Sequence, residues 1–399
     1  MPNKTAAMNE ARAPAGVSPA MILLLASACG LIVANIYYSQ PLIGLIAPAL
    51  GLKLSAASLI VTVTQLGYCS GLVLLVPLGD LLENRRLVVT TLSGAVLALL
   101  LAALAPTAGI FLLASLLIGL CSVVVQMLVP LASHLAPEAS RGRVVGNVVS
   151  GLLFGIMLAR PLSSLLASGL GWRAVFGLSA LLMAVLALVL QRLLPVRRPL
   201  AGHSYRELIG SLWALFRESP LLRRRGLYQA AMFAGFSLYW TAVPLVLATH
   251  FGLGQRGIAL FALAGASGAL AAPLAGRLAD RGHTRVGTGL ALLLVVLAFG
   301  LCWWGASYLP ALLAGGVLLD IGVQTNLVLG QRAIYTLGVE TRSRLNGLYL
   351  TLNFIGGGLG SALASAAFVQ GGWHLVSMVG LGFPLAALLF YATEFRRPA

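Results

Sequence analysis

The chain has 399 residues, of which 59% are apolar and only 9% are charged. A soluble domain is about half apolar and about a quarter charged, so this composition excludes an ordinary soluble enzyme. It also excludes disorder, because so apolar a chain would collapse in water. The formal charge of +16 suggests nucleic acid as a partner, but the basic residues of a nucleic-acid-binding protein would form one face of a soluble domain. The composition instead predicts a chain that lies in lipid.

Twelve stretches are each long and apolar enough to form a membrane-spanning helix, which needs about 20 mostly apolar residues. Backbone groups in lipid must be hydrogen-bonded within their own segment, so these stretches predict helices. The stretches lie near residues 20–41, 56–78, 87–105, 109–133, 145–168, 172–194, 227–248, 257–275, 286–304, 309–331, 345–368 and 374–392.

The positions of Lys and Arg predict the orientation of these spans. With the N-terminus in the cytoplasm, Lys53, Arg173 and Arg256 fall on the outer side, Arg160 falls within a span, and the other basic residues fall inside. Cytoplasmic loops carry such an excess. Abundant Ala, Gly and Leu, with Arg well above Lys, indicate a bacterial genome rich in G and C. We therefore expect a multi-pass protein of the bacterial cytoplasmic (inner) membrane with both termini in the cytoplasm.

Three short blocks recur at a near-constant offset, which predicts two similar halves. They are Arg141-Gly-Arg143 with Arg342-Ser-Arg344, Leu78-Gly-Asp80 with Leu278-Ala-Asp280, and Gly171-Trp172 with Gly372-Trp373. Six spans in each half make the repeats parallel, related by an axis along the membrane normal. We expect an all-α protein of twelve transmembrane helices, arranged as two parallel six-helix repeats around a central cavity. Its parts are an N-terminal tail (1–19), a first bundle (20–194), a linker (195–226), a second bundle (227–392) and a C-terminal tail (393–399).

The middle of the linker, residues 205–216, predicts a short amphipathic helix. Leu208, Leu212 and Leu215 fall on one side of it. One interpretation is a helix at the inner lipid surface, with basic neighbours near anionic headgroups. The other is a flexible connector.

Two polar blocks within the spans resemble a known family. Asn35-Ile-Tyr-Tyr38-Ser-Gln40-Pro41 and Asp320-Ile-Gly-Val-Gln324, the latter with Gln331-Arg332, are similar to blocks of the bacterial drug and sugar exporter branch of the major facilitator superfamily. The layout of six plus six spans resembles the superfamily as a whole. This resemblance implies a monomeric secondary transporter that works by alternating access, with a small-molecule substrate, protons and membrane lipid as partners.

The connection after the second span resembles the superfamily's G-x-L-a-D-R-x-G-R-R motif, and a second copy is present at residues 276–285. An Asp in this place can accept hydrogen bonds from the free amides of a neighbouring helix N-terminus. The resemblance implies a contact that closes the cytoplasmic side; a tight turn with topology charges is the alternative. The candidate gate residues are Asp80, Arg85, Arg86, Arg141, Asp280, Arg281, Arg342 and Arg344.

Two charged side chains, Arg160 and Asp320, fall deep within predicted spans. Each would cost about 3 kcal/mol at a lipid-facing helix centre, so each must face a wet cavity or a partner. Asp320 is the only carboxylate inside a predicted span, which makes it the candidate proton carrier. Arg160 is either its buried charge partner or a site for an anion. The alternative is a structural pair that holds helices together.

The chain departs from the exporter pattern in the fourth and fifth spans. Ser115 stands where exporters have an Arg that is associated with proton coupling, so the departure favours an uncoupled facilitator as the alternative. In the fifth span, the small-residue ladder Gly151, Gly155 and Ala159 permits close helix packing. We expect this ladder to pack against the eighth span, on Gly268, Ala272 and Gly276.

Polar, aromatic and thioether side chains in five spans predict the substrate cavity. They are Asn35, Tyr38, Gln40, Ser122, Gln126, Tyr228, Met232, Tyr239, Trp240, Gln324, Gln331 and Asn353. The sequence holds no nucleotide-binding glycine loop in strand–helix context and no catalytic or metal cluster, so we expect neither an enzyme nor a cofactor. The predicted function is proton-coupled efflux of a small amphipathic compound, drug-like or sugar-like. The alternatives are an uncoupled facilitator of a sugar or metabolite, and a membrane receptor or scaffold without transport.

Overall fold

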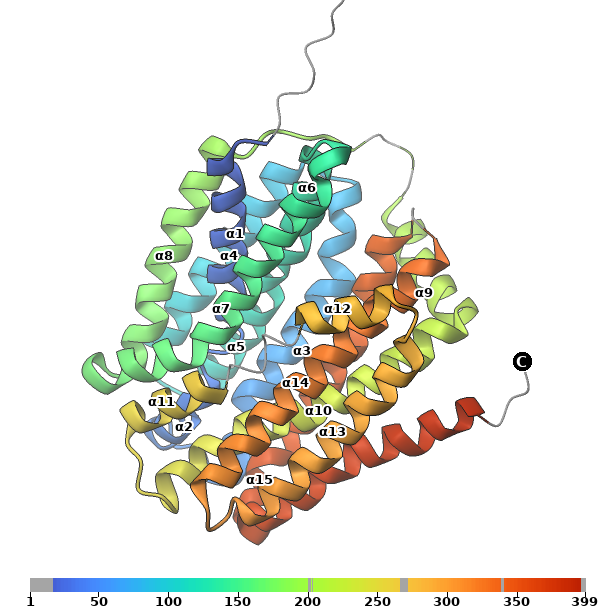
Figure 1. Ribbon diagram of the computed structural model, residues 1–399. Coiled ribbons are helices and arrows are strands. Elements are labelled where there is room, and N and C mark those ends of the chain that lie inside the picture. The colour runs from blue at the N-terminus through green and yellow to red at the C-terminus, as the bar shows by residue number, and fades with distance from the viewer. Residues whose placement is uncertain (1–16, 200–201, 203, 266–271, 339–340, 396–399) are drawn as a thin grey trace, which may run out of the picture.

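The computed structural model describes residues 17–199, 202, 204–265, 272–338 and 341–395. Every regular element within these ranges is helical, as the sequence predicts. Figure 1 shows two groups of helices side by side, one from the first half of the chain (blue to green) and one from the second half (yellow to red). The linker helix α9 lies at one end of the molecule, which we call the linker side.

The helices follow the predicted spans closely. In the first half they are α1 (Pro19–Ala34), α2 (Ile43–Ala49), α3 (Leu59–Leu74), α4 (Asn84–Leu104), α5 (Ala108–Cys121), α6 (Val125–Leu135), α7 (Arg141–Leu170) and α8 (Trp172–Leu193). After α9 (Tyr205–Glu218), the second half forms α10 (Pro220–Thr249), α11 (Gln255–Gly265), α12 (Ala272–Asp280), α13 (Thr284–Trp304), α14 (Leu309–Ile334) and α15 (Arg342–Ala392). The last of these covers two predicted spans and is interrupted at Gly371 and Gly372. Gly372 has a φ of 59°, a conformation that glycine adopts without a steric penalty.

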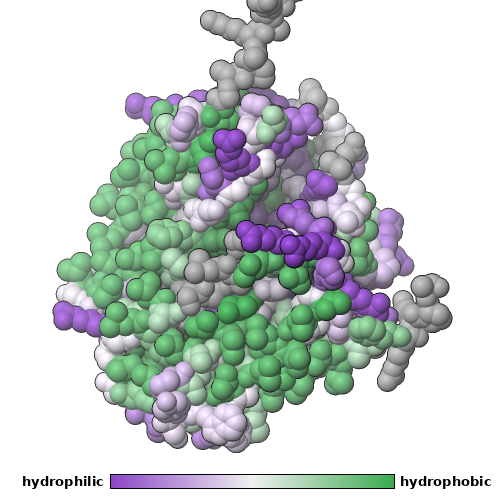
Figure 2. Space-filling view, viewed as in Figure 1, coloured by the Kyte–Doolittle hydropathy of each residue, from purple (hydrophilic) through white to green (hydrophobic). Residues whose placement is uncertain are grey.

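Nine helical segments of the described ranges are long and apolar enough to cross a membrane. Figure 2 shows the matching surface, with apolar residues covering the left and lower middle of the visible face and hydrophilic ones mostly toward its top and right. Leu97, Leu104 and Leu389 are each at least 69% exposed. Such exposure of large apolar side chains suits a lipid solvent and would be unfavourable in water.

The nine segments cover ten of the predicted spans, because the last segment covers two of them. The other two predicted spans differ. In the stretch 20–41 the helix ends at Ala34, and the chain turns before Pro41, which has no N–H to continue a helical ladder. In the stretch 257–275, residues 266–271 lie outside the described ranges. The twelve-span layout with two repeats therefore stays a prediction.

The two halves touch along a seam that is closed away from the linker side. There the Thr62 and Ser361 hydroxyls are hydrogen-bonded at 2.9 Å, and the Gln65 amide donates to the Ser237 hydroxyl at 2.6 Å. An apolar cluster continues this closed region; it consists of Ile43, Ala47, Ala57, Val61 and Leu245. Toward the linker side the halves separate around a cavity of about 510 Å³.

The small-residue ladder of α7 packs against α1 at Gly151 and Gly155, and not against Gly276, the predicted partner whose surroundings are described. A Cβ built on Gly155 would lie 2.2 Å from the carbonyl oxygen of Gly30, and one on Gly30 would lie 2.6 Å from that of Gly151. Both helices present bare backbone at the same level, which is why they approach so closely. Gly268, one of the predicted partners, lies outside the described residues.

The close approach of α1 and α7 leads to a stability prediction. Gly155→Ala is expected to destabilise the protein by about 1–3 kcal/mol, because the added methyl group meets rigid backbone. Gly146→Ala on the same helix is the matched control, since its Cβ meets no atom within 4 Å. It is expected to be neutral or to stabilise by up to about 1 kcal/mol, through helix propensity alone. Thermal unfolding of the purified variants in one detergent measures the difference, and equal melting temperatures would contradict the packing described.

Candidate functional site

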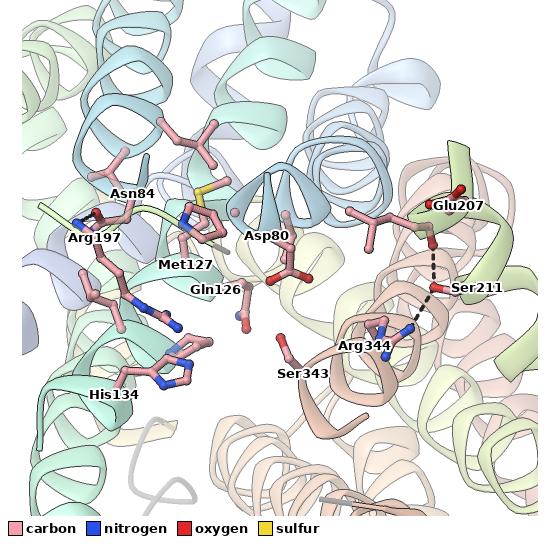
Figure 3. A pocket seen from close by; sticks show the side chains of 18 residues that line it. Asp80, Asn84, Gln126, Met127, His134, Arg197, Glu207, Ser211, Ser343 and Arg344 are labelled. Atoms are coloured by element: carbon pink, nitrogen blue, oxygen red, sulfur yellow. Dashed lines mark hydrogen bonds between the residues drawn. The ribbon is translucent and has the colours of Figure 1, made fainter. Parts of the chain in front are cut away.

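The cavity on the linker side is walled by both halves and by the linker (Figure 3). Asp80 and Gln126 come from the first half, Arg197 and Glu207 from the linker, and Arg344 from the start of α15. In Figure 3 the side chains of Asp80, Gln126 and His134 point into the same space. The cavity is therefore polar at its mouth and is entered from the linker side.

The gate residues stand apart in this conformation. Asp80 and Arg344 line the cavity from opposite halves, and among the described residues neither forms an ion pair within 4.0 Å. Arg344 instead donates to the Ser211 hydroxyl at 3.0 Å. In the second motif copy, Asp280 lies 3.5 Å from Arg332, and both side chains are more than half exposed. The linker side is thus open.

The other gate candidates lie at the linker-side ends of helices. Arg85 donates from Nε to the Leu194 carbonyl at 2.6 Å, and Arg342 donates to the Tyr335 carbonyl at 3.4 Å. Arg86 is in the first turn of α4, Arg141 begins α7, and Arg281 directly follows α12. The contacts of Arg85 and Arg342 each lie within one half in the open conformation.

The linker helix forms one wall of the cavity. Ser204 and Glu207 form a capping box at its start, which fixes where the helix begins. Leu208 and Leu212 are buried toward the seam, and the Tyr205 hydroxyl donates to the Leu74 carbonyl at 3.0 Å. The predicted helix is therefore present, and contacts with both halves favour it over a flexible connector. Its predicted place at the inner lipid surface stays a prediction, because the buried leucines face the seam.

A row of aromatic side chains leads from this cavity into the protein; we call it the aromatic column. Gln126, at the cavity wall, donates to the Tyr68 hydroxyl at 3.1 Å. The rings that follow are, in order, those of Tyr68, Phe354, Phe233, Phe236 and Trp240. The centroids of successive rings lie 4.3, 5.3, 5.1 and 6.4 Å apart. The column crosses between the halves, since Tyr68 is on α3 and the other rings are on α10 and α15.

The column ends at a buried charged centre. The Arg160 guanidinium lies 4.5 Å from the Trp240 ring centroid, 5.0 Å from that of Tyr37 and 5.2 Å from that of Phe236. Its Nε donates to Gln40 Oε1 at 2.7 Å. The Trp240 indole donates to Asp320 Oδ1 at 2.9 Å. Arg160 is 4% exposed and Asp320 is 6% exposed, so both charges are removed from water.

Arg160 and Asp320 belong to one centre without touching each other. No ion pair within 4.0 Å joins these two described residues, although their charges interact across the centre. The Trp240 indole contacts both of them, with its face toward the cation and its N–H on the carboxylate. A direct ion pair would hold both charges permanently, whereas this arrangement leaves each of them open to another partner.

The structure gathers some of the predicted cavity residues here and places others elsewhere. Gln40, Trp240 and Gln126 contact the centre or the column, and Tyr239 donates to the Leu312 carbonyl at 2.8 Å beside Trp240. Tyr228 lies in a different network, with Arg224 at 2.7 Å and Glu394 at 2.9 Å, near the linker side of the second half.

The remaining predicted cavity residues pair within their own halves or are simply buried. Asn35 accepts from Ser179, Ser122 donates to the Ile118 carbonyl, Gln331 donates to Asn346, and Asn353 accepts from Gln229. Tyr38 and Met232 are buried, and Gln324 is half-buried on α14.

Sequence reasoning missed several residues of the site. Tyr37, Tyr68, Phe233, Phe236 and Phe354 carry the aromatic surface, and Gln229 joins Asn326 and Asn353 in a buried amide cluster. An aromatic residue in an apolar span can face lipid, pack against another helix or line a cavity, so its type alone does not predict where its side chain lies. Gln229 offered a usable signal, because an amide within a span needs a polar partner.

Comparisons with known proteins agree with this architecture. The family model described as Major Facilitator Superfamily matches residues 23–305 and 226–399. The chain is 42% identical over 382 residues to the uncharacterized transporter YgaY of Escherichia coli O157:H7, covering 96% of this chain and 97% of that protein. It is 38% identical to the probable transporter SCO4007 of Streptomyces coelicolor, covering 92% and 86%. Neither name states a substrate, so the exporter branch stays a prediction.

Solved structures show the same fold at low identity. The inward-facing, unoccupied form of a bacterial homologue of the human lysosomal transporter Spinster superposes with a TM-score of 0.77 at 17% identity, covering 96% of this chain and 98% of that one. The nucleoside transporter NupG gives 0.75 at 14% identity, covering 94% and 99%. With a family model that matches most of its length and relatives at 42% and 38% identity, the chain belongs to the major facilitator superfamily and is a multi-pass membrane transporter of that type.

Proposed function

We propose that this protein is a proton-coupled secondary transporter of a small amphipathic compound. Twelve spans in two parallel repeats rock about the seam, both termini face the cytoplasm of a bacterial inner membrane, and the linker side is the cytoplasmic side. The observation that carries this proposal is the buried centre of Arg160, Trp240 and Asp320 at the end of an aromatic column.

The placement of this centre suits coupling. Arg160 comes from the first half, and Asp320 and Trp240 come from the second. When the halves rock, the distance between the two charges changes, and so does the cost of keeping the carboxylate ionised away from water. Protonation of Asp320 removes the cost of the buried charge, and this cost differs between the two states. The proton therefore stabilises one state more than the other, as a driven conformational change requires. In the opposite state Asp80 and Arg344 meet and close the cavity.

The direction of coupling depends on the charge of the ligand. A cationic ligand competes with the proton for Asp320, so the two are exchanged, and this gives the efflux that the exporter resemblance implies. An anionic ligand pairs with Arg160 and accompanies the proton. Both versions use the same centre and the same rocking motion.

One observation favours a second candidate, an uncoupled facilitator. Ser115 is buried on α5 and donates to the Phe111 carbonyl at 2.8 Å, so no charge stands where exporters have an Arg. A facilitator would carry its ligand down a concentration gradient at a rate that does not depend on a pH gradient.

Reconstituted flux tests the proposal. The purified protein is placed in vesicles containing a pH-sensitive dye, and candidate amines, sugars and organic acids are added outside under an imposed pH gradient. We expect ligand-dependent proton movement that protein-free vesicles lack. Flux of a labelled ligand without proton movement would favour the facilitator, and absence of flux for every class would favour a receptor or scaffold.

A further inference from the structure

The charged centre has hydrogen-bond donors without acceptors. Arg160 Nη2 and Gln40 Nε2 are buried and have no hydrogen-bond partner in the described part of the chain, although the two side chains are hydrogen-bonded to each other through Nε and Oε1. Gln40 is fully buried, and Arg160 is 4% exposed. A buried donor left unpaired costs about 1–3 kcal/mol, and more when it is charged. A ligand that accepts these hydrogen bonds recovers that free energy.

The two free donors and their surroundings define a ligand chemistry. A guanidinium with a second N–H donor beside it matches an acidic group that offers two oxygens, because such groups accept parallel hydrogen bonds. The faces of Tyr37, Phe236 and Trp240 surround the guanidinium and provide an apolar surface. The space beside Arg160 is only about 10 Å³, so a ligand fits after these side chains part. The aromatic column from the linker-side cavity supplies the route to them.

We propose that the transported ligand is a small monoanion with an apolar or aromatic body, and that Arg160 and Gln40 bind its acidic group. This inference rests on the proposed function for the route and for the proton on Asp320. It goes further by naming the substrate class and the two residues that select it.

The charge balance of the centre links this anion to the proton. Without a ligand, Arg160 and ionised Asp320 sum to zero. An added monoanion leaves one uncompensated buried negative charge, which is strongly unfavourable. A proton on Asp320 restores neutrality. The other titratable groups that interact with these charges are Tyr37 and Tyr239, which are uncharged at neutral pH. The anion and the proton therefore bind together and move in the same direction.

Binding to the purified protein in detergent tests the site. The probes are benzoate, phenylacetate, hexanoate and benzenesulfonate, with benzamide and benzylamine as neutral and cationic counterparts of benzoate. We expect at least one anion to bind by calorimetry and to raise the melting temperature, more at pH 5.5 than at pH 8. We expect neither benzamide nor benzylamine to do so. Absence of binding by all four anions, or equal binding of benzamide, would overturn the inference.

Variants separate a binding role from a structural one. Arg160→Gln is expected to weaken anion binding at least about tenfold. Gln40→Glu keeps a partner for the guanidinium and places an anion on it, so this variant should fold and should lose anion binding. Asp320→Asn should bind the anion equally at pH 5.5 and pH 8, a change in pH profile that misfolding would not produce. Thr91→Val, which removes a hydroxyl bonded to the Leu87 carbonyl on α4, is the matched control and should bind normally. Normal binding by Arg160→Gln and Gln40→Glu would overturn the site.

Flux in vesicles tests the coupling, with benzenesulfonate as the probe because it has no neutral form that crosses the bilayer unaided. Entry of the sulfonate should acidify the vesicle interior, and protein-free vesicles should show neither change. Movement of protons in the opposite direction would overturn the coupling inferred here. If benzylamine binds instead and is exchanged for protons, the anion inference fails while the proposed function stands. If the anions bind at Arg160 and no flux follows, the anion site stands while the proposed function fails.

Discussion

Asp320→Asn is expected to abolish accumulation of ligand against its gradient while leaving downhill exchange intact. The amide still accepts the Trp240 hydrogen bond that the carboxylate accepts at 2.9 Å, so the shape of the centre is kept. It cannot take up or release a proton. One pH unit across the membrane is worth about 1.4 kcal/mol per proton, which supports about tenfold accumulation. The wild type should approach that ratio in vesicles, and the variant should stay at equal concentrations inside and outside.

The control for this experiment is a carboxylate outside the centre. Glu83 lies 3.7 Å from Arg198, whose side chain is 82% exposed, so Glu83→Gln removes one acid at the linker side and should leave accumulation unchanged. Downhill exchange of labelled ligand, measured on the same vesicles, shows that each variant still binds and rocks. Wild-type accumulation by Asp320→Asn would exclude Asp320 as the proton carrier and would favour the uncoupled facilitator.

A disulfide across the closed part of the seam should stop transport reversibly. Thr62 and Ser361 belong to opposite halves, and their hydroxyl oxygens lie 2.9 Å apart. Cysteines at both positions therefore bring two sulfur atoms close enough to be joined by an oxidant. The joined protein cannot open on the side away from the linker, so flux should fall to the level of protein-free vesicles and return after reduction.

The native cysteines must be replaced before that experiment. The described residues include free cysteines at positions 29, 69, 121 and 302, so a background with all four replaced by Ser or Ala is the starting protein. Thr62→Cys and Ser361→Cys alone are the controls and should transport with or without oxidant. A third cysteine at Ser343, which lines the linker-side cavity, should stay reactive in the joined protein. Full transport by the oxidised pair would show that the closed seam described here does not need to open.

The sequence predicted most of the helices and the chemistry of the centre, for a physical reason. Lipid requires long apolar helices and makes buried charge costly, so the one Arg and the one Asp deep within predicted spans stand out in the sequence. The sequence left open whether the two residues are partners, because that depends on how α7 and α14 face each other across the seam. The hydrogen bond of Trp240 to Asp320 depends on the same packing.

The rest of the site escaped prediction because packing, and not residue type, decides it. The small-residue ladder of α7 was visible, but glycines on α1 and on the eighth span offered equally plausible partners. The turn after Ala34 was hidden by an apolar run that continues beyond it, and this turn places Gln40 on Arg160. Phe233 and Phe354 carry no sequence signal that separates them from the aromatic residues that face lipid.

The hydrogen bond from the Trp240 indole to Asp320 gives the protein a built-in optical reporter. Indole emission responds to the electric field along the ring, and the Asp320 carboxylate, which contributes to this field, accepts the hydrogen bond of the indole nitrogen at 2.9 Å. A change in the charge of Asp320 therefore alters the colour of the light that Trp240 emits. The chain has six tryptophans, and subtracting the spectrum of Trp240→Phe isolates this one. The proton that we propose for Asp320 thus becomes readable in real time, without a label and without knowledge of the ligand.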